Sequence, residues 1–535
     1  MINQAIKLSS AGNIKAARLV LENLIASNRE LVAAHYLLGN IALNLMQIDL
    51  ASYHFIQSLH FNPLYRPALI DSARLFELQG RYSDAIELLN RCLSQNKNDA
   101  IALNNLAGIY REQGRLKEAI ELLESLLRID PSHHSAFSNY LYVLNLTKGI
   151  TQQTMKAKHV EWADRHQNSI STKFKKSDHS ILTIGLVSPD LRNHPVGLLV
   201  YPFLRYHNPK ELRIVCFSDL KQEDPLSKIL KTHSDAWYPC NSKSNEAVAE
   251  IIQKEKIDVL IDLAGHTANN RLTLFSKRVA RLQLSWLGYF NTTGLKTIDG
   301  VLMDDEMAPI GCDDWFTEKV YRLPNSRFCF YPPPDLERPI SPKLSSHPFT
   351  FGCFNSISKL TEDVVVAWST ILKANTNTRL ILKARALTDN NTAKWVRQRF
   401  IDQGVQSDRI ECRGWSSRND LLGQYADIDL ALDPFPFNGG LTTFDALYMG
   451  TPVLTIRGES PVARQGASIL KAAGLHTYIC NSLKTYIEKA IELAHALPPD
   501  KIYIRQCLMQ SSLSDAEQYT KDVTSTIKKI YRDLA

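Results

Sequence analysis

The residues best suited to chemistry lie in the segment DLALDPFPFNGGLTTFDALYMG, at positions 429–450. A buried strand is expected to end at Asp433, and a loop rich in Pro and Gly then leads to a helix that starts near Thr442. Backbone amides, hydroxyls and the positive end of the helix would converge on one point, which suits an anion such as a diphosphate. The residues that would supply these groups are Gly439, Gly440, Thr442 and Thr443.

The same segment also allows a purely structural interpretation. Asn438, Gly439 and Gly440 would then only turn the chain, and Thr442 would cap the helix. Asp445 lies one short step into this helix and is equally open. Its carboxylate would either complement the positive helix end or hold a ribose hydroxyl.

Short β-rich runs alternate with helical stretches on both sides of this segment. From Leu182 onward the runs are LTIGLVS, ELRIVCFS, KIDVLIDLAG and RLQLSWLG, and later ones are FTFGCF, TRLILKA, RIECRGW, DIDLALDPF and PVLTI. This alternation predicts βαβ units and two doubly wound, mostly parallel sheets. Ligands bind at the carboxyl ends of such strands, so we expect a crevice between the two domains.

The N-terminal part of the chain has a different pattern. Ala17, Ala51, Ala85 and Ala119 stand 34 residues apart, and Gly12, Gly80 and Gly114 mark the turns between paired helices. This period is typical of tetratricopeptide repeats, which form an α-solenoid with a groove for a polypeptide. The sequence therefore predicts a protein or peptide acceptor that binds along the repeats.

Composition and charge exclude several other classes. A net charge of +7 over 535 residues, without basic runs, does not favour a nucleic-acid partner. No apolar run approaches the roughly 18 residues of a membrane span. The start of the chain lacks the apolar core of a signal peptide and is already in phase with the repeats. Nine scattered cysteines without a C-x-x-C pair suit a reducing compartment, so we expect a cytoplasmic protein.

The expected fold class is α plus α/β, a solenoid followed by two Rossmann-like domains. The predicted divisions are about four repeats at 1–133, a helical cap and connector at 134–178, and the first α/β domain at 179–330. A proline-rich linker follows at 331–348, then the second α/β domain at 349–513 and a C-terminal helix at 514–535.

The chain also resembles glycosyltransferase family 41, in particular the bacterial branch of its O-linked N-acetylglucosamine transferases and SPINDLY-type enzymes. The resemblance rests on the repeats, on the 429–450 segment and on a series of further motifs in matching order. These motifs are NYLYVLN, HVEWAD, IGLVSPDLRNHPVG, DLAGHT, QLSWLGYFNTTG, FGCFNSISKL and GTPVLTIRGESPVARQGASIL. The resemblance implies a two-domain GT-B fold. It also implies an enzyme that transfers a sugar from a nucleotide donor to Ser or Thr, with inversion and without metal.

For the donor, the resemblance implies that Lys359 neutralises the charge that grows on the departing diphosphate, with Asn355 and Ser356 beside it. A cation is needed there if no metal assists. The alternative is an ordinary solvated lysine at a helix start. The other residues that the resemblance gives to donor binding are Gly439, Gly440, Thr442, Thr443 and Asp445, with Arg418 as an additional cation.

For the acceptor, the resemblance makes His194 the candidate base that deprotonates the hydroxyl, since histidine titrates in the right range. The alternative is that His194 only hydrogen-bonds substrate or loop backbone. Asp190 and His266 are the other candidates, and both they and Arg464 are candidate substrate contacts. The alternative for Arg418 and Arg464 is that they are plain surface arginines. Asp427 and Asp429 enter a buried strand, so we expect neither a metal nor a cofactor.

Two departures from the animal enzymes leave the donor open. Leu421 stands where those enzymes have a histidine over the base, and Gly440 with Leu441 replaces a His-Thr pair. UDP-N-acetylglucosamine is the expected donor, and GDP-fucose or UDP-glucose, or an Asn acceptor, are the alternatives. A non-catalytic tetratricopeptide scaffold is the alternative from another class.

Overall fold

The computed structural model describes residues 1–166, 181–332, 348–496 and 500–534. These residues form two compact units. The first unit comprises Met1–Pro131 and Ala384–Val396, and the second comprises Ser132–Lys383 and Arg397–Ala535. Among the helices of the described ranges, none is both long and apolar enough to cross a lipid bilayer.

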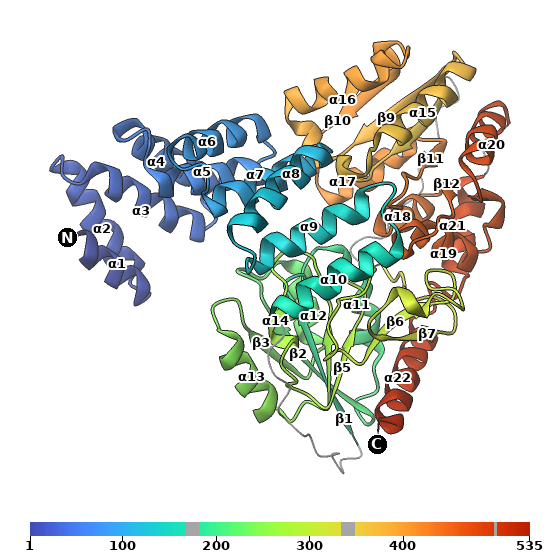
Figure 1. Ribbon diagram of the computed structural model, residues 1–535, viewed down its shortest axis with the longest axis horizontal. Helices are drawn as coiled ribbons and strands as arrows, with labels where there is room; N and C mark the ends of the chain where they lie inside the picture. Colours follow the sequence, from blue (N-terminus) through green and yellow to red (C-terminus); the bar gives the residue numbers. More distant parts are fainter. Residues whose placement is uncertain (167–180, 333–347, 497–499, 535) are drawn as a thin grey trace. The chain divides into compact units, whose positions relative to one another are not determined.

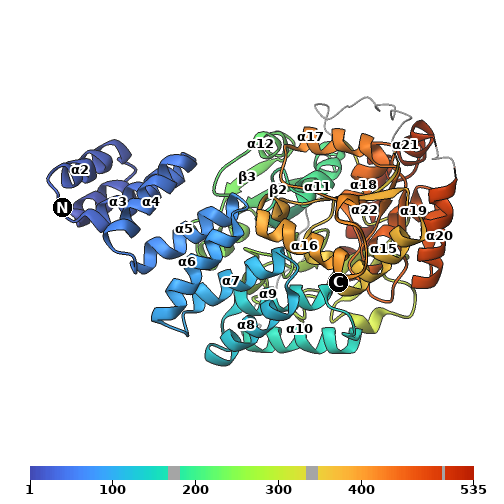
Figure 2. The same ribbon diagram turned by 90° about the horizontal axis from the view of Figure 1, so that it is seen from above.

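The first unit contains four successive helical hairpins, drawn in blue in Figure 1 and seen from above in Figure 2. Their helices are α1 (Ile2–Ser10), α2 (Ile14–Ala26), α3 (Leu31–Asn44), α4 (Ile48–Phe61), α5 (Arg66–Leu78), α6 (Tyr82–Gln95), α7 (Ala100–Glu112) and α8 (Leu116–Ile129). The four phased alanines lie on the second helix of each pair and have no exposed surface. Gly12, Gly80 and Gly114 have φ of 79°, 73° and 79°, which only glycine adopts readily, so each lets the chain reverse. The predicted helical repeat array is confirmed.

A segment from far along the chain belongs to this first unit. Asp389 accepts hydrogen bonds from the backbone and hydroxyl of Ser83, both at 3.2 Å. The amide of Gln113 donates to the hydroxyl of Thr392 at 2.8 Å. Residues 384–396 therefore pack on the turns of the repeats, an association that no local sequence pattern predicted.

The second unit begins with α9 (His134–Leu146) and α10 (Gln152–His166), which pack side by side. They correspond to the predicted cap, and residues 167–178 of the predicted connector lie outside the described residues. A seven-stranded parallel sheet follows, which we call the first lobe, in the order β3-β2-β1-β4-β5-β6-β7. Its strands are β1 (Leu182–Ser188), β2 (Leu212–Ser218), β3 (Ala236–Pro239), β4 (Val259–Asp262), β5 (Leu282–Ser285), β6 (Gly300–Asp304) and β7 (Lys319–Leu323).

The second lobe is a six-stranded parallel sheet in the order β10-β9-β8-β11-β12-β13. Its strands are β8 (Phe349–Cys353), β9 (Thr378–Lys383), β10 (Ile410–Arg413), β11 (Leu430–Leu432), β12 (Val453–Ile456) and β13 (Ile479–Cys480). Most of the predicted linker, residues 333–347, lies outside the described residues. The expected fold class is confirmed: helical repeats are followed by two Rossmann-like lobes.

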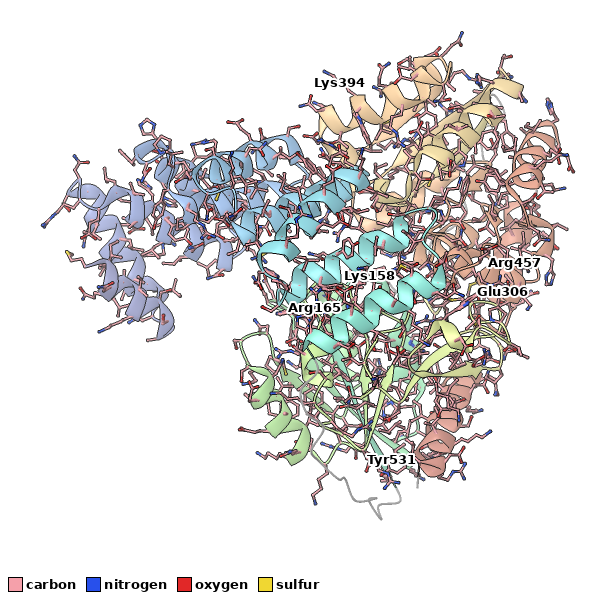
Figure 3. All side chains as sticks on the ribbon, in the orientation of Figure 1. Lys158, Arg165, Glu306, Lys394, Arg457 and Tyr531 are labelled. Atoms are coloured by element: carbon pink, nitrogen blue, oxygen red, sulfur yellow. The ribbon has the colours of Figure 1, made fainter. Side chains whose placement is uncertain are left out.

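The C-terminal helix α22 (Ala516–Asp533) packs on the first lobe, although it follows the second in sequence (Figure 1). The hydroxyl of Tyr519 donates to the carbonyl of Arg327 at 2.7 Å, and that of Tyr531 donates to Asp258 at 3.0 Å. Tyr531, labelled in Figure 3, marks where the end of this helix meets the first lobe. The chain therefore crosses between the lobes twice, which ties them together.

Candidate functional site

The loop between β11 and α18 (Leu441–Tyr448) is held at its base by Asp433. One carboxylate oxygen of Asp433 accepts the backbone N–H of Gly439 at 2.6 Å, and the other accepts the hydroxyl of Thr455 at 2.6 Å. A Cβ on Gly439 would come within 2.6 Å of the Thr442 hydroxyl, so only glycine fits this turn. Sequence reasoning placed Asp433 at a strand end without giving it a role. The signal was a carboxylate directly after a buried strand, at the edge where ligands bind.

The start of α18 lacks a side-chain cap. Gly440 occupies the N-cap position and no side chain accepts a hydrogen bond there. Thr442 lies inside the helix, and its hydroxyl donates to the side-chain oxygen of Asn355 at 2.9 Å. The interpretation in which Thr442 caps the helix is therefore wrong. The helix N-terminus keeps its positive end available to an anion.

Lys359 lies in a single 3₁₀ turn after β8 and faces this loop. Its Nζ donates to the carbonyl oxygen of Asn438 at 2.7 Å and to the Asn355 side-chain oxygen at 3.2 Å. Asn355 therefore joins the ammonium to Thr442. The Lys359 Nζ also lies 4.3 Å from the centre of the Phe437 ring, a cation–π contact. The structure thus brings together the lysine and the glycine-threonine loop that the sequence analysis placed in one site.

The remaining polar groups of the loop are not all satisfied internally. Ser356 turns its hydroxyl toward the backbone N–H of Ser358, at 3.3 Å, and so stabilises its own turn. By contrast, Asn438 Oδ1 and Thr443 Oγ1 are buried and have no hydrogen-bond partner in the part of the chain that is described. Buried polar atoms without partners are costly, and they are expected where a ligand completes the network.

The surroundings of Lys359 predict a pH dependence of donor binding. Burial lowers the pKa of its ammonium from 10.5 to about 8, and the Asp433 carboxylate opposes that fall. The amine is charged below this pKa and neutral above it. If Lys359 contacts a diphosphate, as the resemblance implies, binding needs the charged form. We then expect the affinity for UDP to be highest below the pKa and to fall about tenfold per pH unit above it.

Calorimetric titration with UDP between about pH 7 and about pH 9.5 measures this dependence. The Lys359→Arg variant is the control, because its guanidinium stays charged and its affinity should remain level over that range. A wild-type affinity that does not decline would mean that this ammonium does not contact the diphosphate.

Arg418 and Asp445 bind each other. The guanidinium of Arg418 (α17, Arg418–Gly423) reaches both oxygens of Asp445 at 2.5 and 3.1 Å. Asp445 is buried, and burial raises the pKa of its carboxyl while Arg418 opposes that rise. In this arrangement the two charges neutralise each other beside the loop of residues 433–440, which we call the donor loop after its predicted role. The predicted contacts of Arg418 and Asp445 with the donor remain predictions.

His194 lies at the carboxyl end of β1 in the first lobe, at the N-cap of α11 (Pro195–Tyr206). Its Nδ1 accepts the backbone N–H of Val196 at 3.3 Å and lies 3.8 Å from Asp190. Burial lowers the pKa of the ring, and Asp190 opposes this effect. A nitrogen that accepts an N–H is unprotonated, so the neutral ring carries its proton on Nε2. In this tautomer His194 donates a hydrogen bond through Nε2. Its predicted role as the base needs the other tautomer and remains a prediction.

The side chains of Asp190 and His266 differ in how far their polar atoms are already hydrogen bonded within the protein. Asp190 accepts from Arg192 at 3.2 Å as well as facing His194. His266 has no exposed surface, and its Nδ1 and Nε2 are hydrogen bonded to Ser138 at 3.0 Å and to the carbonyl of Thr293 at 2.9 Å. A substrate contact by His266 would require it to leave one of these partners. Through these two hydrogen bonds, His266 instead joins the cap helix α9 to the first lobe.

The two lobes meet close to Lys359. The Phe290 ring, after β5, packs on Phe437 of the donor loop with ring centres 4.6 Å apart, and Tyr142 of α9 lies 6.0 and 6.2 Å from them. A cavity of about 610 Å³ adjoins this loop, with Phe435, Pro436, residues 147–153 of the cap and residues 458–460, 462 and 463 in its lining. Arg464 points to Glu306 of the first lobe, at 2.9 Å, rather than into that cavity. Neither the cavity nor Glu306 was found from the sequence.

Similar proteins share this architecture. The sequence model of glycosyl transferase family 41 matches residues 112–330 and 341–523, and that of a tetratricopeptide repeat family matches residues 78–139. A solved structure of a mutant O-GlcNAc transferase from Thermobaculum terrenum is similar over 94% of this chain and 98% of that chain, with a TM-score of 0.89 and 29% identity.

Curated relatives include a probable UDP-N-acetylglucosamine–peptide N-acetylglucosaminyltransferase SPINDLY of Petunia hybrida, 32% identical over 425 residues. The match covers 76% of this chain and 45% of that relative, so the chain spans less than half of its length. Another relative with the same enzyme description, SEC of Arabidopsis thaliana, is 28% identical over 368 residues. These residues cover 65% of this chain and 37% of SEC. From the extent of the family match and the shared two-lobed fold, we conclude that the chain belongs to glycosyl transferase family 41.

Proposed function

We propose that this protein transfers N-acetylglucosamine from UDP-N-acetylglucosamine to a Ser or Thr hydroxyl of a polypeptide. The observation that carries the proposal is the junction of Lys359, Asn355 and Thr442 at an uncapped helix start. An ammonium and a helix N-terminus directed at one point suit a leaving diphosphate. The names of the relatives, which specify a UDP-N-acetylglucosamine donor and a peptide acceptor, support this choice of substrates.

In the proposed reaction, the acceptor oxygen attacks the anomeric carbon from the face opposite the diphosphate, so the configuration inverts. The bond from that carbon to the diphosphate oxygen breaks, and its electrons remain on UDP. Lys359 and the start of α18 stabilise this developing charge without a metal ion. On the acceptor side we place His194 of the first lobe, whose Nε2 proton would hydrogen-bond substrate. The hydroxyl proton leaves to a base or to water.

The acceptor side of the proposal rests on the repeats. Arrays of helical hairpins bind extended polypeptides in their grooves, so we propose that the acceptor lies along the solenoid of α1–α8. We further propose that the reaction takes place in the cytoplasm. None of the nine cysteines, all of which lie in the described ranges, forms a disulfide bond, which suits a reducing compartment.

A panel of nucleotide sugars tests the proposed donor. The purified protein is incubated with UDP-N-acetylglucosamine, UDP-glucose or GDP-fucose, and the released nucleotide is measured with and without candidate acceptor proteins. We expect release from UDP-N-acetylglucosamine, with a matching mass increase on Ser or Thr of an acceptor. Release from another donor would change the assigned sugar. If no nucleotide is released and calorimetry detects no binding of any donor, the protein is a non-catalytic scaffold.

A further inference from the structure

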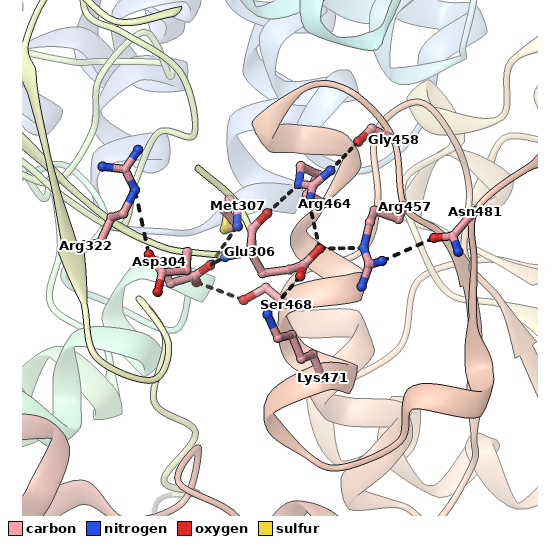
Figure 4. A network of polar contacts seen from close by, with 11 residues as sticks. Asp304, Glu306, Met307, Arg322, Arg457, Gly458, Arg464, Ser468, Lys471 and Asn481 are labelled. Atoms are coloured by element: carbon pink, nitrogen blue, oxygen red, sulfur yellow. Dashed lines mark hydrogen bonds and ion pairs between the residues drawn. The ribbon is translucent and has the colours of Figure 1, made fainter. Parts of the chain in front are cut away.

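A single carboxylate of the first lobe is surrounded by cations of the second lobe (Figure 4). Glu306, just after β6, accepts from Arg457 at 2.6 Å and from Arg464 at 2.9 Å through one oxygen, and from Lys471 at 3.2 Å through the other. Its side chain is only 9% exposed. Figure 3 shows Glu306 and Arg457 next to each other although they come from different sheets.

The cations lie on the elements that follow β12. Arg457 directly follows the strand, while Arg464 and Lys471 lie at the two ends of α19 (Gln465–Ala472). Arg464 donates through Nε to the carbonyl of Glu306 and through Nη1 to the carbonyl of Gly458, at 2.9 Å. Its planar guanidinium therefore ties residues 458–464 to the first lobe in one orientation.

A second contact supports the same junction. Asp304, at the end of β6, accepts the hydroxyl of Ser468 in α19 at 2.8 Å. The other oxygen of Asp304 accepts the backbone N–H groups of Glu306 and Met307, at 3.0 and 2.8 Å. The backbone of Glu306 is thus fixed independently of its side chain, so the carboxylate is presented to the second lobe from a rigid turn.

The loop of residues 458–464 also holds the donor loop. The carbonyl of Val462 accepts the backbone N–H of Asn438 at 3.0 Å, and the carbonyl of Asn438 in turn accepts the Lys359 ammonium at 2.7 Å. The 458–464 loop is closed by a hydrogen bond from Gly458 to Ala463 at 2.8 Å. A continuous series of short contacts therefore leads from Glu306 through Arg464 and Val462 to Lys359.

We propose that Glu306 is a positioning residue for catalysis: by gathering Arg457, Arg464 and Lys471 onto the first lobe, it sets the place of Asn438 and of the Lys359 ammonium in the cleft. The inference rests on the proposed function in that Lys359 acts on the donor diphosphate. A buried ion pair is weak evidence for stability, because desolvation offsets much of its attraction. Its effect here is geometric, since the carboxylate fixes where the second lobe meets the first.

The Glu306→Gln variant tests the proposal, with binding of UDP measured by calorimetry and donor hydrolysis measured in parallel. Displacing a catalytic group by about 1 Å costs on the order of a hundredfold. We expect a loss of about tenfold to a hundredfold in kcat/KM for the donor, together with weaker UDP binding. Asp305→Asn is the matched control, because the neighbouring Asp305 side chain is 63% exposed and lies 3.7 Å from Arg322, outside the cluster.

A double-mutant cycle with Lys359→Ala separates positioning from general destabilisation. If Glu306 acts through Lys359, Glu306→Gln weakens UDP binding in the wild type but changes it little when the lysine is already absent. Equal losses in both backgrounds would overturn the proposal. Arg464→Lys provides a second variant if Glu306→Gln folds poorly, since lysine keeps the charge but cannot bridge Glu306 and Gly458 together.

Hydrogen exchange gives a readout that needs no ligand. We expect faster exchange in peptides covering residues 434–440 and 458–464 of Glu306→Gln, with the solenoid unchanged, and no such effect in Asp305→Asn. Unchanged exchange in these two loops would overturn the inference. A wild type that binds no UDP and hydrolyses no donor would refute the proposed function instead, and the exchange comparison would still decide whether Glu306 orders the donor loop.

Discussion

The Lys359→Ala variant is expected to lose about 3 kcal/mol of transition-state stabilisation, which is about a hundredfold in kcat. The ammonium is the cation that the described site directs at the donor loop, through Asn355 and the carbonyl of Asn438. In the proposed reaction, removing it takes a positive charge away from the departing diphosphate. Release of UDP from UDP-N-acetylglucosamine, followed under saturating donor, measures the loss.

The fold should survive this substitution. Burial already disfavours the charged form of Lys359, and the pKa of its ammonium is lowered for that reason. We therefore expect a melting temperature close to that of the wild type. Lys373→Ala is the matched control, because Lys373 is an exposed lysine of the same lobe whose ammonium donates to the carbonyl of Gln403 at 2.9 Å. Turnover of Lys359→Ala near the wild-type rate would contradict the assigned role.

The second large effect concerns stability. The Asp445→Asn variant should lose about 3 to 5 kcal/mol in the free energy of unfolding, because it leaves the guanidinium of Arg418 without its buried counter-charge. Asp445 has 3% of its side chain exposed, and Arg418 has 18%. Chemical denaturation followed by circular dichroism measures the change. Glu488→Gln serves as the comparison, since that exposed pair with Lys484 is 3.9 Å long and should contribute less than about 1 kcal/mol.

Replacing both members of the pair distinguishes a structural role from donor binding. In the double variant Arg418→Met, Asp445→Leu no charge is left buried, so stability should return to within about 1 kcal/mol of the wild type. Because both carboxylate oxygens of Asp445 are taken by Arg418, we expect UDP affinity to change less than about threefold. A stable double variant with far weaker UDP binding would instead assign Asp445 to the ribose.

The two histidines show how far residue type and strand position alone can go. His194 and His266 both follow first-lobe strands, so both qualified as groups of the cleft. The structure gives His266 two internal partners and no exposed surface, whereas it leaves His194 partly exposed at a helix start. One of the partners that enclose His266 is Ser138, which lies 128 residues earlier in the chain, and no local pattern encodes that contact.

Local patterns were sufficient for the elements and for the loop chemistry. The 34-residue alanine spacing predicted the helical hairpins, because each repeat buries the same small residue between its helices. Longer β-rich runs predicted the strands that carry Lys359 and the glycine-threonine loop. The strands β3, β6, β7 and β13 were not predicted. Their length of two to five residues does not explain this, because the predicted β4 and β11 have only four and three residues.

The sequence by itself thus determined the order of the domains and the residue types at the ends of their strands, since both depend on short-range periodicity and turn chemistry. Only the tertiary structure decided which of those residues meet. Lys359 reaches Asn438 across 79 residues, Thr442 reaches Asn355 across 87, and Arg464 reaches Glu306 across 158. Such pairs form because parallel strands bring their carboxyl ends to one edge and because two lobes face each other, and neither arrangement leaves a periodic mark on the chain.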